Sequence, residues 1–468
     1  MKMQPEPTSD MTATATSLTA SSKSKQYIDK PWLLPVQTTY QFVNANIVDP
    51  EQGQLLKNMT VVISNGKVLF VRAGSEQQHQ VNGDLNFKTV DLRGKYLCPG
   101  LIDAHVHVTA TPGEIGLKNT YKAISQSMNN YRTVFLCREM LHRGFTTARD
   151  CGGADGALKE AIAEWLIPGP RLLIAGHALS QTGGHGDQRD AHSDDDPTTK
   201  CCAGHKSGIS RLCDGPQECM VAVRDEMRKG ADFIKIMAGG GVSSKLNNLS
   251  HAQFLPEEIS AIVRTAASFD TYVTAHAYSS RAIRHAIDHG ALGIEHGNFL
   301  DEATAKYMAE KNVYLTPTLV TYNTLMIPPF DQYVTGDSSI KNQMVMRSGL
   351  NALRIAEEAG VTICYGSDLM AGMQKFQANE FSVRARVQSN LTILRGATIN
   401  PARMMRMENL IGRIAEGFYA DILILKENPL DDVTVLDNRE NLCAVLKEGR
   451  VVTSSLQEIP VDTAKEPW

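Results

Sequence analysis

The sequence predicts an α/β protein: a (β/α)8 (TIM) barrel with a small composite β-sandwich domain formed by both termini. Between residues 101 and 406, eight short apolar segments alternate with helical patterns, as in a parallel barrel. Both ends of the chain instead carry β-rich segments separated by turns, such as the hairpin signal at Asn65-Gly66. The length of 468 residues suits one large domain and a smaller one. A doubly wound open sheet is the alternative for the central region. In either fold we expect the active-site residues at the carboxyl ends of the strands.

The domain boundaries follow from these changes in pattern. The beginning of the chain is rich in Ser, Thr, Ala and Pro, a composition that predicts disorder. We therefore expect a disordered segment at residues 1–37, a composite β-sandwich from residues 38–97 and 407–455, a barrel over residues 98–406 and a tail at residues 456–468.

The barrel elements are expected in strict alternation. The eight strands are predicted at residues 101–108, 145–150, 171–176, 233–237, 272–277, 291–296, 313–318 and 362–368. Helices are predicted at residues 154–165, 216–230, 256–269, 279–290 and 301–312, with a longer one ending at residue 360. Pro216 and Pro256 in a first turn, and Gly230 and Gly290 at the end of a helix, are typical boundary residues.

Composition and charge exclude several classes of protein. A net charge of −4 gives no basic footprint for nucleic acid or for an anionic membrane, so we expect a small-molecule substrate. The sequence contains no run of about 18 apolar residues, so no transmembrane helix is predicted, and no signal peptide is visible. The chain as written is therefore expected in the cytoplasm, with secretion as the alternative if a leader has been replaced.

One segment of the barrel region has an unusual composition. Cys201, Cys202, Cys213 and Cys219 cluster in a spacing that fits no standard zinc module, so free thiols or a loop disulfide are expected there. The hydrophilic insertion at residues 188–211 is expected to be a solvated loop, with a lid over the site as the alternative.

The first predicted strand carries the first candidate ligands. His105 and His107 lie two residues apart, and alternate residues of a strand share a face. Two neutral imidazoles on one face can bind a single transition-metal ion, although buried histidines satisfied by the core would give the same pattern.

Other strand ends supply similar groups. Lys235 lies on the fourth strand, His276 and His296 end the fifth and sixth, and Asp368 ends the eighth, whereas strands two, three and seven offer no comparable group. Their convergence at one mouth predicts a metal centre, because isolated buried polar groups are costly. A lysine ammonium has no lone pair for a cation. Lys235 therefore either pairs with Asp368 or carries a CO₂-derived carbamate whose two oxygens bridge two metals.

These motifs resemble the amidohydrolase superfamily over residues 40–452: LIDAHVH, the strand-end Lys235, the His276 and His296 pair, GSD, ATINPAR and GRIAEGFYADILIL. Within it, the segments KYLCPGLIDAHVHVTATPGE, SQTGGHGDQRD, GADFIKIMAGGGVSS and TAHAYS are similar to ochratoxinases and Xaa-Pro dipeptidases. The resemblance implies two metals, with the first held by His105, His107 and Asp368 and the second by His276 and His296. It also implies that carbamylated Lys235 and a hydroxide bridge the two ions, and that the protein is a homo-oligomer, with octamers among its relatives.

The expected reaction is hydrolysis of an amide bond by the metal-bridging hydroxide, with Asp368 as the catalytic proton carrier and carbamylated Lys235 completing the centre. Zinc is the expected metal because the ligands are nitrogen and oxygen atoms, and Mn, Co or Ni are alternatives. N-acyl amino acids are the expected substrates. The most specific prediction is ochratoxin A, which would be cleaved to ochratoxin α and L-phenylalanine. The alternatives are an Xaa-Pro or other dipeptidase, a cyclic-amide hydrolase, and a non-catalytic binding module.

Four residues are candidates for substrate binding. His185 lies in a loop beyond the third strand, and Tyr278 follows His276. Gly239 and Gly240 could offer backbone N–H groups to a carboxylate. Arg149 is expected only to form a strand-end ion pair with its neighbour Asp150.

Overall fold

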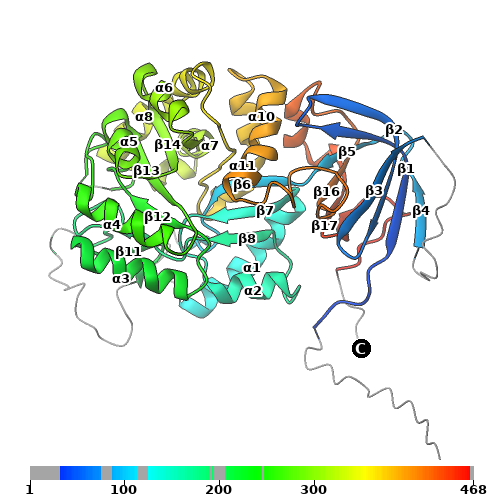
Figure 1. The fold of residues 1–468 in the computed structure, drawn as a ribbon, viewed down its shortest axis with the longest axis horizontal. Coiled ribbons are helices and arrows are strands. Elements are labelled where there is room, and N and C mark those ends of the chain that lie inside the picture. The colour runs from blue at the N-terminus through cyan, green and yellow to red at the C-terminus, as the bar shows by residue number, and fades with distance from the viewer. Residues whose placement is uncertain are drawn as a thin grey trace, which may run out of the picture.

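The computed structural model describes residues 32–74, 87–113, 125–189, 192, 206–244 and 247–463. Most of the N-terminal segment expected to be disordered lies outside these ranges, as do Cys201, Cys202 and most of the insertion at residues 188–211. Figure 1 shows an α/β body beside a β-sheet that contains strands from both ends of the chain.

The sheet beside the body combines the two ends of the chain. Its strands are β1 (Thr39–Asp49), β2 (Gln54–Ser64), β3 (Lys67–Ala73), β4 (Phe87–Asp91), β5 (Tyr96–Pro99), β16 (Ile422–Leu425), β17 (Leu442–Lys447) and β18 (Arg450–Ser454). Among the described residues their order is β18-β17-β16-β5-β1-β2-β3, with β4 paired to β1. The two ends join where β5 runs antiparallel to β16, with Leu97 opposite Ile424. Both side chains are fully buried in the same apolar cluster, which explains why the distant segments pair.

The body is built on parallel strands. They are β6 (Leu101–Val106), β7 (Phe145–Asp150) and β8 (Arg171–Ile174) in one sheet, and β9 (Ala178–Ser180), β12 (Ile234–Met237), β13 (Val273–Ser279), β14 (Gly293–Phe299) and β15 (Tyr314–Thr316) in another, extended by β11 (Ser210–Leu212) and β10 (Lys206–Ser207). Their near-continuous burial is typical of parallel strands covered on both faces.

Two predicted strands differ from expectation. The third, residues 171–176, ends early, as β8, because the chain turns at Gly176, whose φ of +68° favours glycine; a separate short strand, β9, follows the turn. The eighth, residues 362–368, forms only an isolated bridge, Leu315 to Ile363. Its backbone nevertheless bonds on both sides, since Cys364 N donates to Leu315 O and Ala104 N donates to Tyr365 O, both at 2.8 Å. The segment thus lies between β15 and β6.

Helices surround these strands (Figure 1). They are α1 (Gln126–His142), α2 (Gly156–Ala163), α3 (Gly215–Arg228), α4 (Pro256–Ala267), α5 (Ser280–Asp288), α6 (Glu302–Glu310), α7 (Leu319–Thr324), α8 (Asp337–Glu358), α9 (Glu380–Arg384), α10 (Asn390–Gly396) and α11 (Ile399–Met404), with 3₁₀ turns at Phe330–Tyr333, Ala371–Asn379, Val433–Asp437 and Arg439–Asn441. Asp155, Ser279 and Asp301 begin α2, α5 and α6 by accepting a backbone N–H bond, as good N-caps do.

Ion pairs connect the α/β body to the terminal sheet. Arg171, at the start of β8, donates to Asp421 at 2.6 Å and to Glu448 at 2.7 Å, which connects the body to the terminal sheet.

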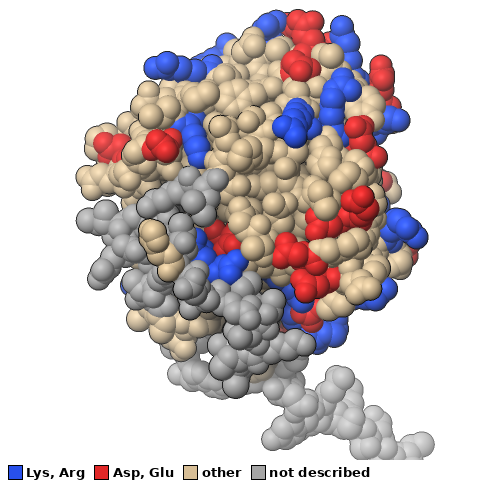
Figure 2. Space-filling model, turned by 90° about the vertical axis from the view of Figure 1, so that its left-hand side faces the viewer, with Lys and Arg blue, Asp and Glu red and all other residues tan. Residues whose placement is uncertain are grey.

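On the molecular surface shown in Figure 2, acidic and basic side chains are interspersed. Among the described helices, none has both the length and the apolar character needed to cross a membrane.

Candidate metal centre

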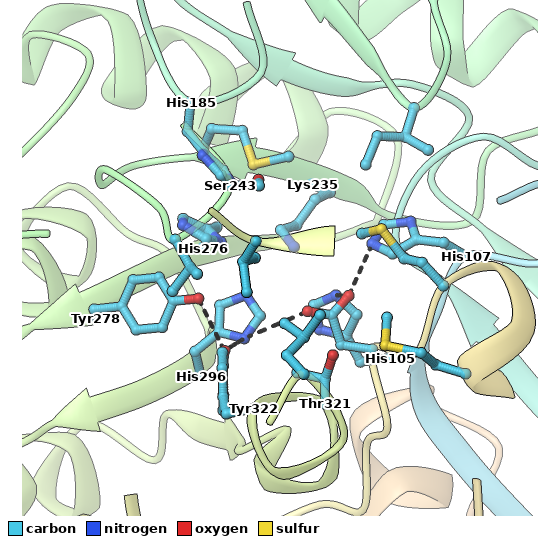
Figure 3. A pocket seen from close by; sticks show the side chains of 18 residues that line it. His105, His107, His185, Lys235, Ser243, His276, Tyr278, His296, Thr321 and Tyr322 are labelled. Carbon is cyan, nitrogen blue, oxygen red and sulfur yellow. Dashed lines mark hydrogen bonds and ion pairs between the residues drawn. The ribbon is translucent and has the colours of Figure 1, made fainter. Parts of the chain in front are cut away.

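The six side chains predicted to bind metal line one pocket at the carboxyl ends of the parallel strands (Figure 3). Five of them lie in β6, β12, β13 and β14 or directly after β6, and the sixth lies in the segment after Cys364; they are His105, His107, Lys235, His276, His296 and Asp368. The carboxyl group of Asp368 is 14% exposed, whereas the other five side chains are at most 3% exposed. Residues far apart in the sequence therefore meet in a largely buried site.

Three ligand atoms converge within this pocket. The Nε2 atoms of His105 and His107 lie 3.5 and 3.4 Å from the same atom, Oδ1 of Asp368. That oxygen is buried and has no hydrogen-bond partner among the described residues. Burial alone would raise the pKa of Asp368, but the neighbouring histidines hold it well below its usual range. Two imidazoles and an ionised carboxylate, all within 4.8 Å of one another, fit a divalent cation.

Hydrogen bonds on the far side of each ring orient these two histidines. His107 Nδ1 lies 2.8 Å from the carbonyl of Gly152, which can only accept, so Nδ1 carries the proton. His105 Nδ1 lies 2.8 Å from Oε2 of Glu295. In the neutral tautomer that these bonds favour, each ring presents an unprotonated Nε2 to the pocket, which is the form that binds metal.

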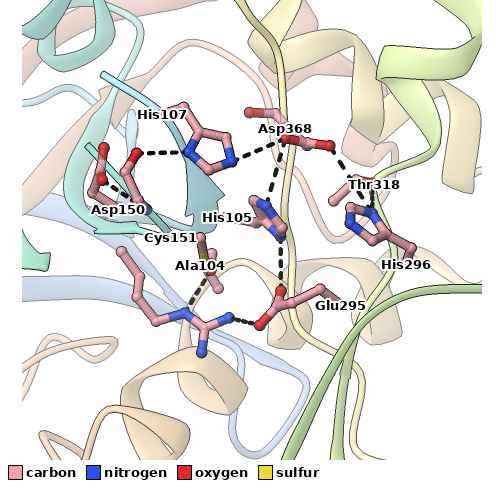
Figure 4. A network of polar contacts seen from close by, with 12 residues as sticks. Ala104, His105, His107, Asp150, Cys151, Glu295, His296, Thr318 and Asp368 are labelled. Carbon is pink, nitrogen blue, oxygen red and sulfur yellow. Dashed lines mark hydrogen bonds and ion pairs between the residues drawn. The ribbon is translucent and has the colours of Figure 1, made fainter. Parts of the chain in front are cut away.

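Glu295 belongs to a buried ionic network beneath the pocket (Figure 4). Its other oxygen accepts from Arg149 and from Thr274, and Arg149 also donates to the Ala104 carbonyl at 2.6 Å. Burial alone would raise the pKa of Glu295, but Arg149 and His105 hold it well below its usual value. The carboxylate therefore stays ionised opposite His105.

The expected ion pair between Arg149 and Asp150 is wrong, because Arg149 turns to Glu295. Asp150 instead accepts the backbone N–H groups of Val108, Gly152 and Ala154 at 2.8, 3.0 and 3.1 Å. These bonds fix the turn whose Gly152 carbonyl holds His107.

The other two histidines lie next to each other on the opposite side of Asp368. The ring centres of His276 and His296 are 4.6 Å apart. His276 Nε2 lies 3.2 Å from the Gly240 carbonyl, and His296 Nδ1 lies 2.8 Å from Thr318 Oγ1. Burial lowers the pKa of both imidazoles well below the usual value, so both are neutral. A neutral pair with one free nitrogen each can bind a second cation.

Lys235 reaches the same pocket from β12 and is 1% exposed. Within the described part of the chain, its amine makes no ion pair with Asp368 and no hydrogen bond. The predicted alternative, a Lys235 to Asp368 salt bridge, is therefore not formed. A buried ammonium without an acceptor is costly.

The model for the Amidohydrolase family matches residues 96–452, most of the chain. The chain belongs to this family. An ochratoxinase from Aspergillus niger is 32% identical over 418 residues, an alignment that covers 87% of this chain and 86% of the relative. The chain is thus a metal-dependent hydrolase of amide or peptide bonds.

Solved structures of other amidohydrolases share the fold. A prolidase complexed with N-methylphosphonate-L-proline has a TM-score of 0.83 at 39% identity and covers 89% of this chain and 100% of its own. The A. niger ochratoxinase crystal structure has a TM-score of 0.79 at 28% identity, with coverages of 92% and 99%. A Xaa-Pro dipeptidase with bound methionine has a TM-score of 0.75 at 26% identity, with coverages of 88% and 99%.

The predicted substrate-binding residues of this amidohydrolase divide into two groups. His185 and Tyr278 line the pocket, and the His185 ring stacks on His276 with centres 4.3 Å apart. Gly239 and Gly240 do not line it. The N–H of Gly240 is engaged by the His251 carbonyl at 3.3 Å, so it is not free to bind a carboxylate as expected.

Two kinds of residue at or beside the pocket were not predicted. Thr318 and Tyr322 contact His296, although the seventh strand was expected to supply no comparable group. Apolar side chains form much of the wall; they are Ile209, Met237, Val242, Leu325, Val334, Met370 and Met373. The tyrosine could have been found from its polar hydroxyl in a segment that is otherwise buried, because buried hydroxyl groups need partners.

Proposed function

We propose that this amidohydrolase is a binuclear amidase of the carboxypeptidase type, which cleaves the amide bond of N-acyl amino acids. The observation that carries the proposal is the convergence of two histidine pairs, Asp368 and Lys235 in one pocket with apolar walls. The most specific substrate that we propose is ochratoxin A, an N-acyl phenylalanine. The 32% identity to an ochratoxinase supports that choice.

The residues divide naturally between two metal ions. We propose that His105, His107 and Asp368 hold the first ion, and that His276 and His296 hold the second. The unpartnered Oδ1 of Asp368 supports the first set. Lys235 would bridge both ions as a carbamate, which the lack of an acceptor for its amine supports. We propose zinc because the donors are nitrogen and oxygen atoms. When bound, the metals supply Lewis acidity and lower the pKa of water.

The protein's own side chains then direct the proton and the substrate. Asp368 Oδ2, the oxygen that does not face His105 and His107, takes the proton of the attacking water and returns it to the departing nitrogen. Tyr278 donates to the carbonyl oxygen of the scissile amide, where negative charge develops. Burial raises the pKa of this phenol, so it keeps the proton that it must donate. His185, which stacks on His276, lines the same pocket and offers a second polar contact.

The pocket wall indicates the substrate class. Methionine, valine and leucine side chains offer an adaptable apolar surface, which suits an aromatic or aliphatic amino-acid side chain. An Xaa-Pro dipeptide is the second candidate, favoured by the 39% identity to a prolidase with a bound phosphonate analogue of a proline peptide. A non-catalytic module is less favoured, since all six proposed ligand positions are filled. A cyclic-amide hydrolase stays an alternative, which the assay below includes.

The architecture and assembly complete the proposal. We propose that residues 98–406 form a closed (β/α)8 barrel, with residues 362–368 in the position of the eighth strand, and that both chain ends form a β-sandwich. The backbone bonds of Tyr365 and Cys364 to β6 and β15 support the closure. We expect a homo-oligomer acting on a small molecule.

A substrate panel tests this function. Purified protein is assayed with ochratoxin A, N-acetyl-L-phenylalanine, Met-Pro and hydantoin, before and after removal of metal with a chelator. We expect hydrolysis of the N-acyl phenylalanines, its loss with the chelator and its recovery with zinc. The Asp368→Asn variant is the matched inactive control. Metal content below one ion per folded chain, or activity that survives complete removal of metal, would contradict the proposal.

A further inference from the structure

Four polar side chains lie in contact beside the pocket: Tyr278, His296 and Tyr322 (Figure 3), and Thr318, which lies next to His296 (Figure 4). Tyr322 Oη lies 3.0 Å from His296 Nδ1, 2.9 Å from Tyr278 Oη and 3.3 Å from Thr318 Oγ1. Thr318 Oγ1 in turn lies 2.8 Å from His296 Nδ1. All four side chains are at most 3% exposed. Bulk water therefore does not compete for these hydrogen bonds, and each proton must find a partner within the group or in the pocket.

The direction of each bond follows from counting protons. On the proposed function, on which this inference rests, His296 binds metal through Nε2, so Nδ1 carries the proton. Nδ1 donates to Thr318 Oγ1 at 2.8 Å, which is the shorter of its two contacts, the other being Tyr322 Oη at 3.0 Å. The Thr318 hydroxyl then needs an acceptor. Within the described part of the chain its only other partner is Tyr322 Oη. Tyr322 accepts that bond and can donate only to Tyr278 Oη.

Tyr278 ends this chain of donors. Its oxygen accepts from Tyr322, and no other described residue bonds to it. Its own proton is therefore left for the pocket that it lines, where a substrate carbonyl would lie. If the bond between the two tyrosines ran the other way, Tyr278 would present a lone pair to the substrate and would oppose the negative charge of the transition state.

We propose that Tyr322 is a positioning residue, which makes the Tyr278 hydroxyl a hydrogen-bond donor to the carbonyl oxygen of the substrate. Tyr322 is within hydrogen-bond distance of Tyr278 on one side and of His296 and Thr318 on the other. It thus connects the ring of His296, a proposed metal ligand, with the orientation of a substrate donor.

A double-mutant cycle tests this role, with Y322F, Y278F and the double variant assayed on N-acetyl-L-phenylalanine. Loss of the Tyr278 donor should lower kcat by about 100-fold. Y322F should lower kcat by about 10-fold with little change in KM, and by less than about 2-fold when Tyr278 is already phenylalanine. Metal content should remain that of the wild type. Y40F, which alters a buried tyrosine in the terminal sheet, is the control and should keep full activity.

Binding of a transition-state mimic separates this inference from the choice of substrate. The N-methylphosphonate derivative of L-phenylalanine is titrated into each zinc-loaded protein by calorimetry, which requires no turnover. We expect Y322F to weaken binding by about 10-fold, and to have no further effect in the Y278F background. The proposal would be overturned if Y322F weakened phosphonate binding equally in the wild-type and Y278F backgrounds, if it weakened binding in neither, or if Y322F lost metal. A wild type that binds the phosphonate but hydrolyses none of the panel contradicts the proposed function alone.

Discussion

Replacing Glu295 with glutamine tests whether the buried ionic network holds the first metal site. The substitution keeps the size of the side chain but removes the charge that faces His105 Nδ1 at 2.8 Å. Loss of such a supporting carboxylate typically lowers metal affinity by about 10- to 100-fold, or about 1.4–2.7 kcal/mol. The same change leaves the Arg149 guanidinium, which is fully buried, without its anion. An unpaired buried charge of this kind costs about 3–5 kcal/mol of stability.

A matched variant separates these two effects. Glu380 pairs with Arg384 at 2.7 Å, both are fully buried, and the pair touches no site histidine. Burial raises the pKa of Glu380 to about 7, so the comparison is made at pH 8.5, where both glutamates are ionised. E295Q and E380Q should both unfold at lower urea concentrations when free of metal.

Zinc affinity, measured by competition with a chromophoric chelator, should fall only in E295Q. An affinity within about 2-fold of the wild type, or an equal loss in E380Q, would refute the argument that Glu295 orients His105 for metal.

Three further predictions concern single groups. Asp368→Asn should reduce kcat by at least about 1,000-fold, because the amide can neither take nor return the proton, and steady-state kinetics on N-acetyl-L-phenylalanine checks this. Lys235→Ala should lose metal as well as activity, and millimolar propionate should restore part of both by supplying a carboxylate; restoration of neither would count against a carbamate. Burial raises the pKa of Asp437 from 3.8 to about 6, so the stability associated with its protonated form is complete below pH 3.8 and is lost as the pH rises through 6. Asp437→Asn should therefore raise the free energy of unfolding by about 2 kcal/mol at pH 7.5 and by progressively less below pH 6, as urea titrations at several pH values would measure; an effect independent of pH would contradict this.

Which polar side chains line one pocket could be predicted from the sequence, because parallel strands end at a common edge. His105, His107, Lys235, His276 and Asp368 each stand at or near such an end, and the structure brings them to one pocket. Their convergence needed no knowledge of the loops.

The residues that orient the ligands could not be predicted in the same way. Glu295 and His296 are adjacent, and strand alternation would send them to opposite faces. Instead Glu295 contacts His105, and His296 lies beside His105 and Asp368. His296 has a φ of +77°, which departs from strand geometry. Tyr322 was missed for another reason: it lies in α7, a short buried helix that the periodicity of the sequence did not indicate.

Backbone conformation and backbone hydrogen bonds account for other differences between the predictions and the structure. The turn at Gly176 shortens the third predicted strand, and the Gly240 N–H is engaged by the His251 carbonyl; side-chain patterns reveal neither. Cys213 and Cys219 are buried free thiols with sulfur atoms 3.7 Å apart, so the expected alternative of a loop disulfide does not apply to this pair. Cys201 and Cys202 lie outside the described residues.

The account depends most on a binuclear centre bridged by a modified lysine. A crystal structure of the protein grown with zinc and bicarbonate, with anomalous diffraction recorded above and below the zinc edge, tests it directly. We expect two zinc peaks, one among His105, His107 and Asp368 and the other beside His276 and His296, joined by carbamate density on Lys235. A single peak, or an unmodified Lys235 amine beside two ions, would contradict the account.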